Sequence, residues 1–334
     1  MTVPGGGDRS GSPGQTVLYI GGSGRSGSTL LDRMLGEIPG FLAVGEIRYL
    51  WREGLIEDRL CGCGRRFSRC RFWKDVGDEA FGGWAQIDAE RMVRLERVVS
   101  RQRHIPLMLA RGILPSFDQR FRVYTGALSR LYRAVGQVSG AAVVVDSTKD
   151  PAYALSLRLS EVDLRIVHLV RDSRGVAFSW DREVPTGDAP GRDVYLHRYG
   201  TLETGARWLT YNALLELIGR GVPYVRIRYE DLVPFPVRHL ENVIGLTSRP
   251  LPEDAFAFLS GDQVQFRKHH TVAGNPMRVT TGAITLRRDE EWERRMRHGA
   301  RLLMSAVTWP LLARYGYPVR SWHRDGIGER IEVR

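Results

Sequence analysis

The sequence predicts an α/β fold of three layers, in which helices flank a central parallel sheet. Short apolar runs rich in β-branched residues alternate with helical patterns along the 334-residue chain. Such alternation is typical of a parallel sheet that is covered on both faces. A glycine-rich turn joins the first apolar run to the first helical pattern, and a long segment before the second run predicts a helical insertion.

Four buried strands are expected where apolar residues follow one another without a helical period. They are Thr16–Ile20, Ala142–Asp146, Leu164–Val170 and Tyr224–Arg228. Helical patterns follow the first three strands, over Ser28–Leu35, Pro151–Leu159 and Arg174–Arg182. Strands joined through helices run parallel, because the helix carries the chain back to the edge where the previous strand began.

The pattern predicts one domain over residues 16–320, with an insertion over roughly 50–140. Helices are expected in this insertion over Asp88–Arg103 and Asp118–Val138, where they would bind a substrate or cap the site. A further helix is expected over Asp289–Arg301. Residues 1–15 are rich in Gly, Ser and Pro and are expected to form a disordered leader, and residues 321–334 a polar tail.

Composition excludes several classes of protein. No run reaches the roughly 18–20 consecutive apolar residues of a membrane-spanning helix, and the leader lacks the apolar centre of a secretory signal, so a cytoplasmic protein is expected. The formal net charge is +11, with arginine dominant; either a codon bias or attraction of an anionic ligand explains it. Without a recognised nucleic-acid motif, we expect no nucleic-acid partner.

The run Gly21–Leu31 (GGSGRSGSTLL) carries the strongest local signal for a ligand. Glycines let the backbone approach an anion closely, and the free amides at the start of the following helix bind phosphate or sulfate. The run nearly fits the P-loop pattern G-x-x-x-x-G-K-[ST], which predicts a P-loop-like sheet, but Ser28 stands in place of the lysine. The nearest cation is Arg25, which argues against ordinary ATP hydrolysis and favours a different phosphoanhydride.

Within this run, Gly24–Leu31 resembles the 5′-phosphosulfate loop of sulfotransferases that use 3′-phosphoadenosine-5′-phosphosulfate (PAPS) as the donor. Arginine rather than lysine at this place is similar to the bacterial and tyrosylprotein branches of that family. The resemblance implies that PAPS is the donor. It also implies that the 5′ end is bound by Arg25, Ser26, Gly27, Ser28, Thr29 and Leu30.

The family marks a second anion site, for the 3′-phosphate of PAPS, by an arginine just after a strand and a serine eight residues later. Arg171 follows the expected strand Leu164–Val170, and Ser179 stands eight residues further on. The turn and helix between them can return the hydroxyl toward the guanidinium, which suits bidentate phosphate contact. The resemblance therefore implies that Arg171 and Ser179 bind the 3′-phosphate.

Two further segments resemble the family. Tyr229, in Val225–Leu232 (VRIRYEDL), matches a tyrosine that contacts the adenine, with a core tyrosine at a strand end as the alternative. The run His269–Arg278 (HHTVAGNPMR) is similar to a C-terminal loop of bacterial members, although it departs from the Gly-rich, lysine-ended loop of the animal cytosolic enzymes. The similarity implies closure over the 3′-phosphate by Gly274, Asn275 and Arg278.

Sulfuryl transfer needs a base for the acceptor hydroxyl, and cations or amides for the leaving phosphate. Glu46, in Val44–Arg48 (VGEIR), resembles the Gly-Glu motif that carries the base in the tyrosylprotein and some bacterial enzymes. Lys149 resembles the lysine of a Lys-Asp-Pro segment that stabilises the bridging oxygen. The resemblance therefore implies that Glu46 and Lys149 are the catalytic groups of an in-line displacement.

Three other residues near these groups have alternative interpretations. Arg48 and Trp51 are candidates for orienting the acceptor, with a solvated charge and core packing as the alternatives. Asp146 fits the magnesium-binding carboxylate of a nucleotide hydrolase, but that role depends on the missing loop lysine. We therefore expect a reaction that requires no metal.

The three cysteines lie together at Cys61, Cys63 and Cys70. A structural zinc site takes four ligands, often with two residues between paired cysteines. Here one residue separates the first pair, and the sequence shows no fourth ligand. A local disulfide is disfavoured in a reducing cytosol, so free thiols are the expected state and no metal site is predicted.

The sequence thus predicts a sulfotransferase that moves a sulfuryl group from PAPS to a hydroxyl of a small or medium-sized acceptor. A sugar, a secondary metabolite or a lipid would each serve as that acceptor. The alternatives are an atypical P-loop kinase or NTPase and a non-enzymatic nucleotide-binding protein. The sequence does not indicate the acceptor or the oligomeric state.

Overall fold

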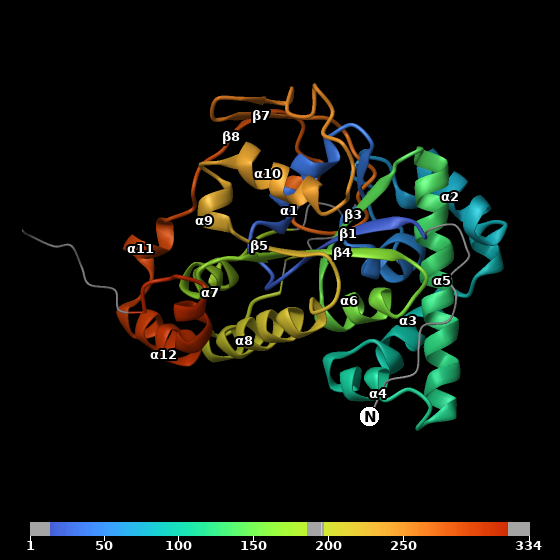
Figure 1. Cartoon of the computed structure of the whole chain (residues 1–334), viewed down its shortest axis with the longest axis horizontal. Coiled ribbons are helices and arrows are strands. Elements are labelled where there is room, and N and C mark those ends of the chain that lie inside the picture. The colour runs from blue at the N-terminus through green and yellow to red at the C-terminus, as the bar shows by residue number, and fades with distance from the viewer. Residues whose placement is uncertain (1–13, 186–194, 196, 320–334) are drawn as a thin grey trace, which may run out of the picture.

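The computed structural model describes residues 14–185, 195 and 197–319. Most of the expected leader and all of the expected tail, residues 321–334, lie outside this part. Within it, a five-stranded parallel sheet forms the centre (Figure 1), in the order β2-β3-β1-β4-β5. Its strands are β1 (Thr16–Gly21), β2 (Phe41–Ala43), β3 (Val143–Lys149), β4 (Asp163–Val170) and β5 (Tyr224–Arg228).

The four predicted strands are confirmed as β1, β3, β4 and β5. The sequence analysis missed β2, a strand of only three residues. Alternate residues of β1 face opposite sides of the sheet. Leu18 and Ile20 pack with α1 (Ser28–Gly36) and α10 (Pro236–Gly245), whereas Val17 and Tyr19 pack with α6 (Pro151–Arg158) and α8 (Thr201–Ile218). The predicted three layers are therefore confirmed, with these helix pairs on opposite faces (Figure 1).

The register of the sheet brings the ends of three strands to one edge. Gly21, the last residue of β1, lies opposite both Lys149 of β3 and His168 of β4. The strands β3 and β4 come later in the chain and pair with opposite sides of the central strand β1. This edge is therefore a topological switch point, where α/β folds bind ligands.

The inserted segment is helical, as the sequence predicts. It contains η2 (Leu50–Ile56), α2 (Arg71–Phe81), α3 (Ala89–Val99), α4 (Ile105–Leu109) and α5 (Pro115–Ser139). The buried guanidinium of Arg48 joins this segment to the sheet, since it pairs with Glu96 of α3 at 2.7 Å and with Asp150, the residue after β3. The insertion therefore packs on the edge of the sheet that carries the candidate site.

The C-terminal third supplies α7 (Ser173–Asp181), α9 (Tyr229–Leu232) and a small antiparallel sheet of β6 (Leu259–Ser260), β7 (Gln263–Phe266) and β8 (Gly282–Thr285). The predicted single helix over Asp289–Arg301 is wrong. The chain becomes extended at Met296, between α11 (Glu291–Arg295) and α12 (His298–Arg314). Arg301 of α12 bonds the carbonyl groups of Trp292 and Glu293, which fixes this bend.

Among the described residues, no helix combines the length and apolar character needed to cross a membrane.

Candidate active site

A cavity of ≈ 910 Å³ opens at the switch-point edge of the sheet. Most of the residues predicted for the site line it: Arg25, Gly27, Ser28, Thr29, Leu30, Glu46, Arg48, Lys149, Arg171, Ser179, Tyr229, Gly274 and Asn275. They come from segments far apart in the sequence, so the fold gathers them into one place. Three other predicted residues, Ser26, Trp51 and Arg278, do not line the cavity.

The glycine-rich turn between β1 and α1 needs its glycines for close packing. Gly27 has a φ of 89° and caps α1. A Cβ on Gly27 would lie 2.5 Å from the ring of Tyr229, and one on Gly24 would lie 2.6 Å from the ring of Trp180. A side chain at either position would therefore displace one of these two rings, which line the cavity. Ser28 and Thr29, the first residues of α1, line the cavity, so the helix N-terminus faces it, as an anion site requires.

Arg25 is a half-buried cation on the wall of the cavity. It stacks on Trp180 at 5.0 Å from the ring centroid, and its Nε and Nη2 atoms have no hydrogen-bond partner among the described residues. Burial lowers the pKa of Arg25, and Arg171 lowers it further, although Glu46 opposes the change. Because unpaired buried donors are costly, these atoms fit an anionic ligand.

Arg171, just after β4, contacts the glycine-rich turn directly. Its Nη1 donates to the carbonyl of Arg25 at 3.1 Å, and its Nη2 pairs with Oδ2 of Asp289 at 2.9 Å. The guanidinium lies 4.7 Å from the centroid of the Tyr229 ring. Its Nε atom has no partner within the described part of the chain. The two predicted anion sites therefore face the same cavity.

Glu46 and Lys149 form an ion pair, with Nζ and Oε1 2.6 Å apart. Lys149 ends β3 with a φ of 71° and also donates to the carbonyl of Ser147 at 2.8 Å. A Cβ on Gly274 would lie 3.2 Å from Oε1 of Glu46, so the loop after β7 borders this pair. The predicted base and the predicted leaving-group cation are thus brought together.

Two buried carboxyl groups lie behind this pair. Asp146 does not line the cavity. It accepts hydrogen bonds from Tyr132 and from the backbone of Thr148, while burial raises its pKa to about 6. These hydrogen bonds hold the Asp146 carboxylate within the protein, beneath the cavity wall. The sequence analysis missed Asp32 of α1, a buried residue whose pKa burial also raises, and no motif distinguishes it.

Two predicted acceptor contacts have structural roles. Arg48 borders the cavity, but its guanidinium is neutralised by Glu96 and Asp150. Trp51 is fully buried and packs against Phe81 and Trp84. The expectation that Trp51 touches the acceptor is therefore corrected to core packing.

The residues predicted to close over the 3′-phosphate do not lie together beside Arg171. Arg278 is buried and donates to the carbonyl groups of Thr271 and Leu60, which anchors the loop. Gly274 borders Glu46, whereas the segment in contact with Arg171 includes Asp289. The sequence analysis missed Arg287 and Asp289, which line the cavity, because nothing distinguishes them in an arginine-rich chain.

Comparison with known proteins adds family evidence to this geometry. A family model described as "Sulfotransferase family" matches residues 18–253. The sulfotransferase domain of the olefin synthase of Synechococcus PCC 7002 is 19% identical, with a TM-score of 0.50, over 92% of this chain and 97% of that one. A sulfotransferase domain from the curacin biosynthetic pathway is 15% identical, with a TM-score of 0.49, over 92% and 100%. No curated protein sequence matches the chain.

Proposed function

The chain belongs to the sulfotransferase family, and on this premise we propose that it transfers a sulfuryl group from PAPS to a hydroxyl of a small or medium-sized acceptor. One observation favours PAPS as the donor. Arg25 and Arg171 converge on one cavity, touch through the Arg25 carbonyl, and both keep buried nitrogen atoms without a partner among the described residues. A nucleotide with anionic groups at two ends satisfies both of them.

Both Arg25 and Arg171 contribute to the proposed donor site. The amides of residues 24–29 and the guanidinium of Arg25 would hold the 5′-phosphosulfate, while Arg171 and Ser179 would hold the 3′-phosphate. Tyr229 lies against Gly27 and beside Arg171, and its ring would contact the adenosine. Arg171 retains Nε for the phosphate while Nη2 holds Asp289.

When bound, PAPS supplies an activated sulfuryl group and leaves as 3′-phosphoadenosine 5′-phosphate. Glu46 would accept the proton of the acceptor hydroxyl through a carboxylate oxygen. Lys149 would move its ammonium from Glu46 to the bridging oxygen and stabilise the negative charge that develops there. The ion pair of Glu46 and Lys149 places both groups at one point of the cavity.

The acceptor would enter from the side formed by the insertion. Arg52 of η2, together with Val93 and Arg97 of α3, lines the cavity there. A volume of ≈ 910 Å³ lies near the upper end of small-molecule sites, which leaves space for a modest acceptor beside a nucleotide.

A transfer assay tests this proposal. The full chain is incubated with PAPS labelled in the sulfuryl group and with fractionated metabolites as acceptors, and the products are identified by mass spectrometry. We expect label in a hydroxyl-containing product without added metal. Phosphoryl transfer or phosphate release from ATP and magnesium, with no transfer from PAPS, would favour the kinase or NTPase. Tight binding of 3′-phosphoadenosine 5′-phosphate without turnover on any acceptor would favour the non-enzymatic binder.

A further inference from the structure

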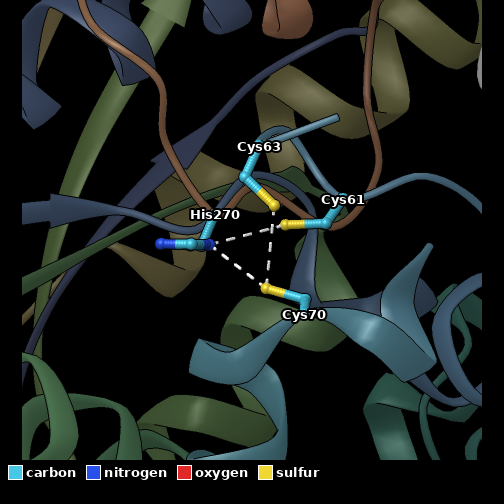
Figure 2. A group of neighbouring side chains, drawn as sticks. All are labelled: Cys61, Cys63, Cys70 and His270. Atoms are coloured by element: carbon cyan, nitrogen blue, oxygen red, sulfur yellow. Dashed lines mark hydrogen bonds between the residues drawn. The ribbon is translucent and has the colours of Figure 1, made fainter. Parts of the chain in front are cut away.

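Four side chains that take no part in the proposed reaction meet outside the cavity (Figure 2). They are Cys61, Cys63, Cys70 and His270, and their sulfur and nitrogen atoms all lie within 4.8 Å of one another. No disulfide joins the three cysteines, and Cys61 and Cys70 are buried. The sequence analysis did not identify His270 as a fourth ligand, because this residue lies far along the chain, after β7.

Three distances among these atoms are close to those of a tetrahedral metal site. A zinc ion with bonds of ~2.3 Å to sulfur and ~2.0 Å to nitrogen separates its ligand atoms by ~3.8 Å between sulfurs and ~3.5 Å between sulfur and nitrogen. Sγ of Cys63 and Cys70 are 3.8 Å apart. Nδ1 of His270 lies 3.2 Å from Sγ of Cys70 and 3.7 Å from Sγ of Cys61.

Contacts within the protein hold these groups in place. Cys70 is the N-cap of α2, so the start of this helix fixes its position. The ring of His270 stacks on Phe72 at 4.7 Å between centroids, and Nε1 of Trp73 donates to the His270 carbonyl. Gly62 must be glycine, since a Cβ there would lie 2.3 Å from Oγ1 of Thr271.

We propose that Cys61, Cys63, Cys70 and His270 bind one structural zinc ion. Three thiolates and one imidazole form a closed ligand set, which leaves no open position for a substrate. Softer thiolate ligands select zinc over the magnesium or calcium that oxygen ligands would hold. Although only one residue separates Cys61 from Cys63, the fold brings their two sulfur atoms into the same cluster (Figure 2).

The ion would join the insertion to the loop beside the proposed base. Cys61, Cys63 and Cys70 belong to the segment between η2 and α2, whereas His270 belongs to the loop after β7 that contains Gly274. Backbone hydrogen bonds already connect this loop to its neighbours: Gly62 donates to the Thr271 carbonyl at 2.9 Å, and Val272 donates to the Val44 carbonyl at 2.9 Å. The zinc ion would therefore fix the position of the Gly274 loop next to Glu46.

Metal analysis of the full chain, purified under reducing conditions with zinc present, tests the proposal. We expect about one zinc ion per chain. Cobalt in its place should give the intense visible bands of a tetrahedral thiolate site. Removal of the metal by a strong chelator should lower the Tm by roughly 5–10 °C. None of these measurements depends on transfer activity, so they are independent of the proposed reaction.

Variants distinguish this site from adventitious binding. Cys70→Ser and His270→Ala should lose most of the zinc, whereas His270→Cys should retain it with a fourth thiolate. Ser68→Ala, an exposed neighbour bonded to Asp58, is the matched control and should keep the wild-type metal content. If Cys70→Ser does not fold, the cobalt spectrum of the wild-type chain decides. A metal-free chain with three reactive thiols, a Cys63–Cys70 disulfide, or a cobalt spectrum without thiolate bands would overturn the proposal.

Discussion

Replacing Glu46 by Gln is expected to lower kcat for sulfuryl transfer by about 10²–10⁴-fold, because the amide cannot accept the proton of the acceptor hydroxyl. Affinity for the donor should stay within about threefold, since the loop, Arg25 and Arg171 are unchanged. Steady-state kinetics with PAPS, together with titration of 3′-phosphoadenosine 5′-phosphate, separates these two effects.

Glu53→Gln is the matched control for this change. Glu53 also lines the cavity, but its carboxylate pairs with Arg59 at 3.4 Å rather than with Lys149. Its kcat should remain within about threefold of the wild-type value. Turnover of Glu46→Gln close to wild type, in a variant with an unchanged Tm, would remove Glu46 as the base.

Replacing Arg171 by Ala should weaken binding of 3′-phosphoadenosine 5′-phosphate by roughly 30–150-fold, because charged hydrogen bonds to a phosphate contribute about 2–3 kcal/mol. Binding of adenosine 5′-phosphate, which lacks the 3′-phosphate, should fall by less than about fivefold. Calorimetric titration of both nucleotides gives the two ratios directly.

Arg182→Ala controls for the loss of one positive charge. Arg182 follows α7, is exposed and pairs with Glu291 at 2.8 Å, so both nucleotides should bind to this variant nearly as they bind to wild type. Equal losses for both nucleotides in Arg171→Ala would contradict the assignment of the 3′-phosphate to this residue.

The fold was predictable from sequence where local pattern and tertiary packing agree. The apolar runs that became β1, β3, β4 and β5 are long enough to be recognised, and each has a face buried under helices. The three residues of β2 carry too short a signal, although they pair along β3 through Phe41 and Val143. The bend at Met296 depends on Arg301 reaching back to α11, a contact that no local pattern encodes.

The site was predictable to the extent that its residues belong to short motifs. The glycine-rich turn, Glu46, Lys149 and Arg171 each stand at or just beyond a strand end, and parallel strands bring those ends together. Trp51 could not be placed this way, because its burial depends on Phe81 and Trp84 of the insertion. His270 could not be joined to the cysteines, since only the folded chain brings it beside Cys70.

A crystal structure of the chain with 3′-phosphoadenosine 5′-phosphate is the most direct test of the shared nucleotide site. We predict the 5′-phosphate against the amides of residues 24–29 and the 3′-phosphate at ~3 Å from the guanidinium of Arg171. A nucleotide bound elsewhere, or one whose 3′-phosphate points away from Arg171 into solvent, would contradict the account.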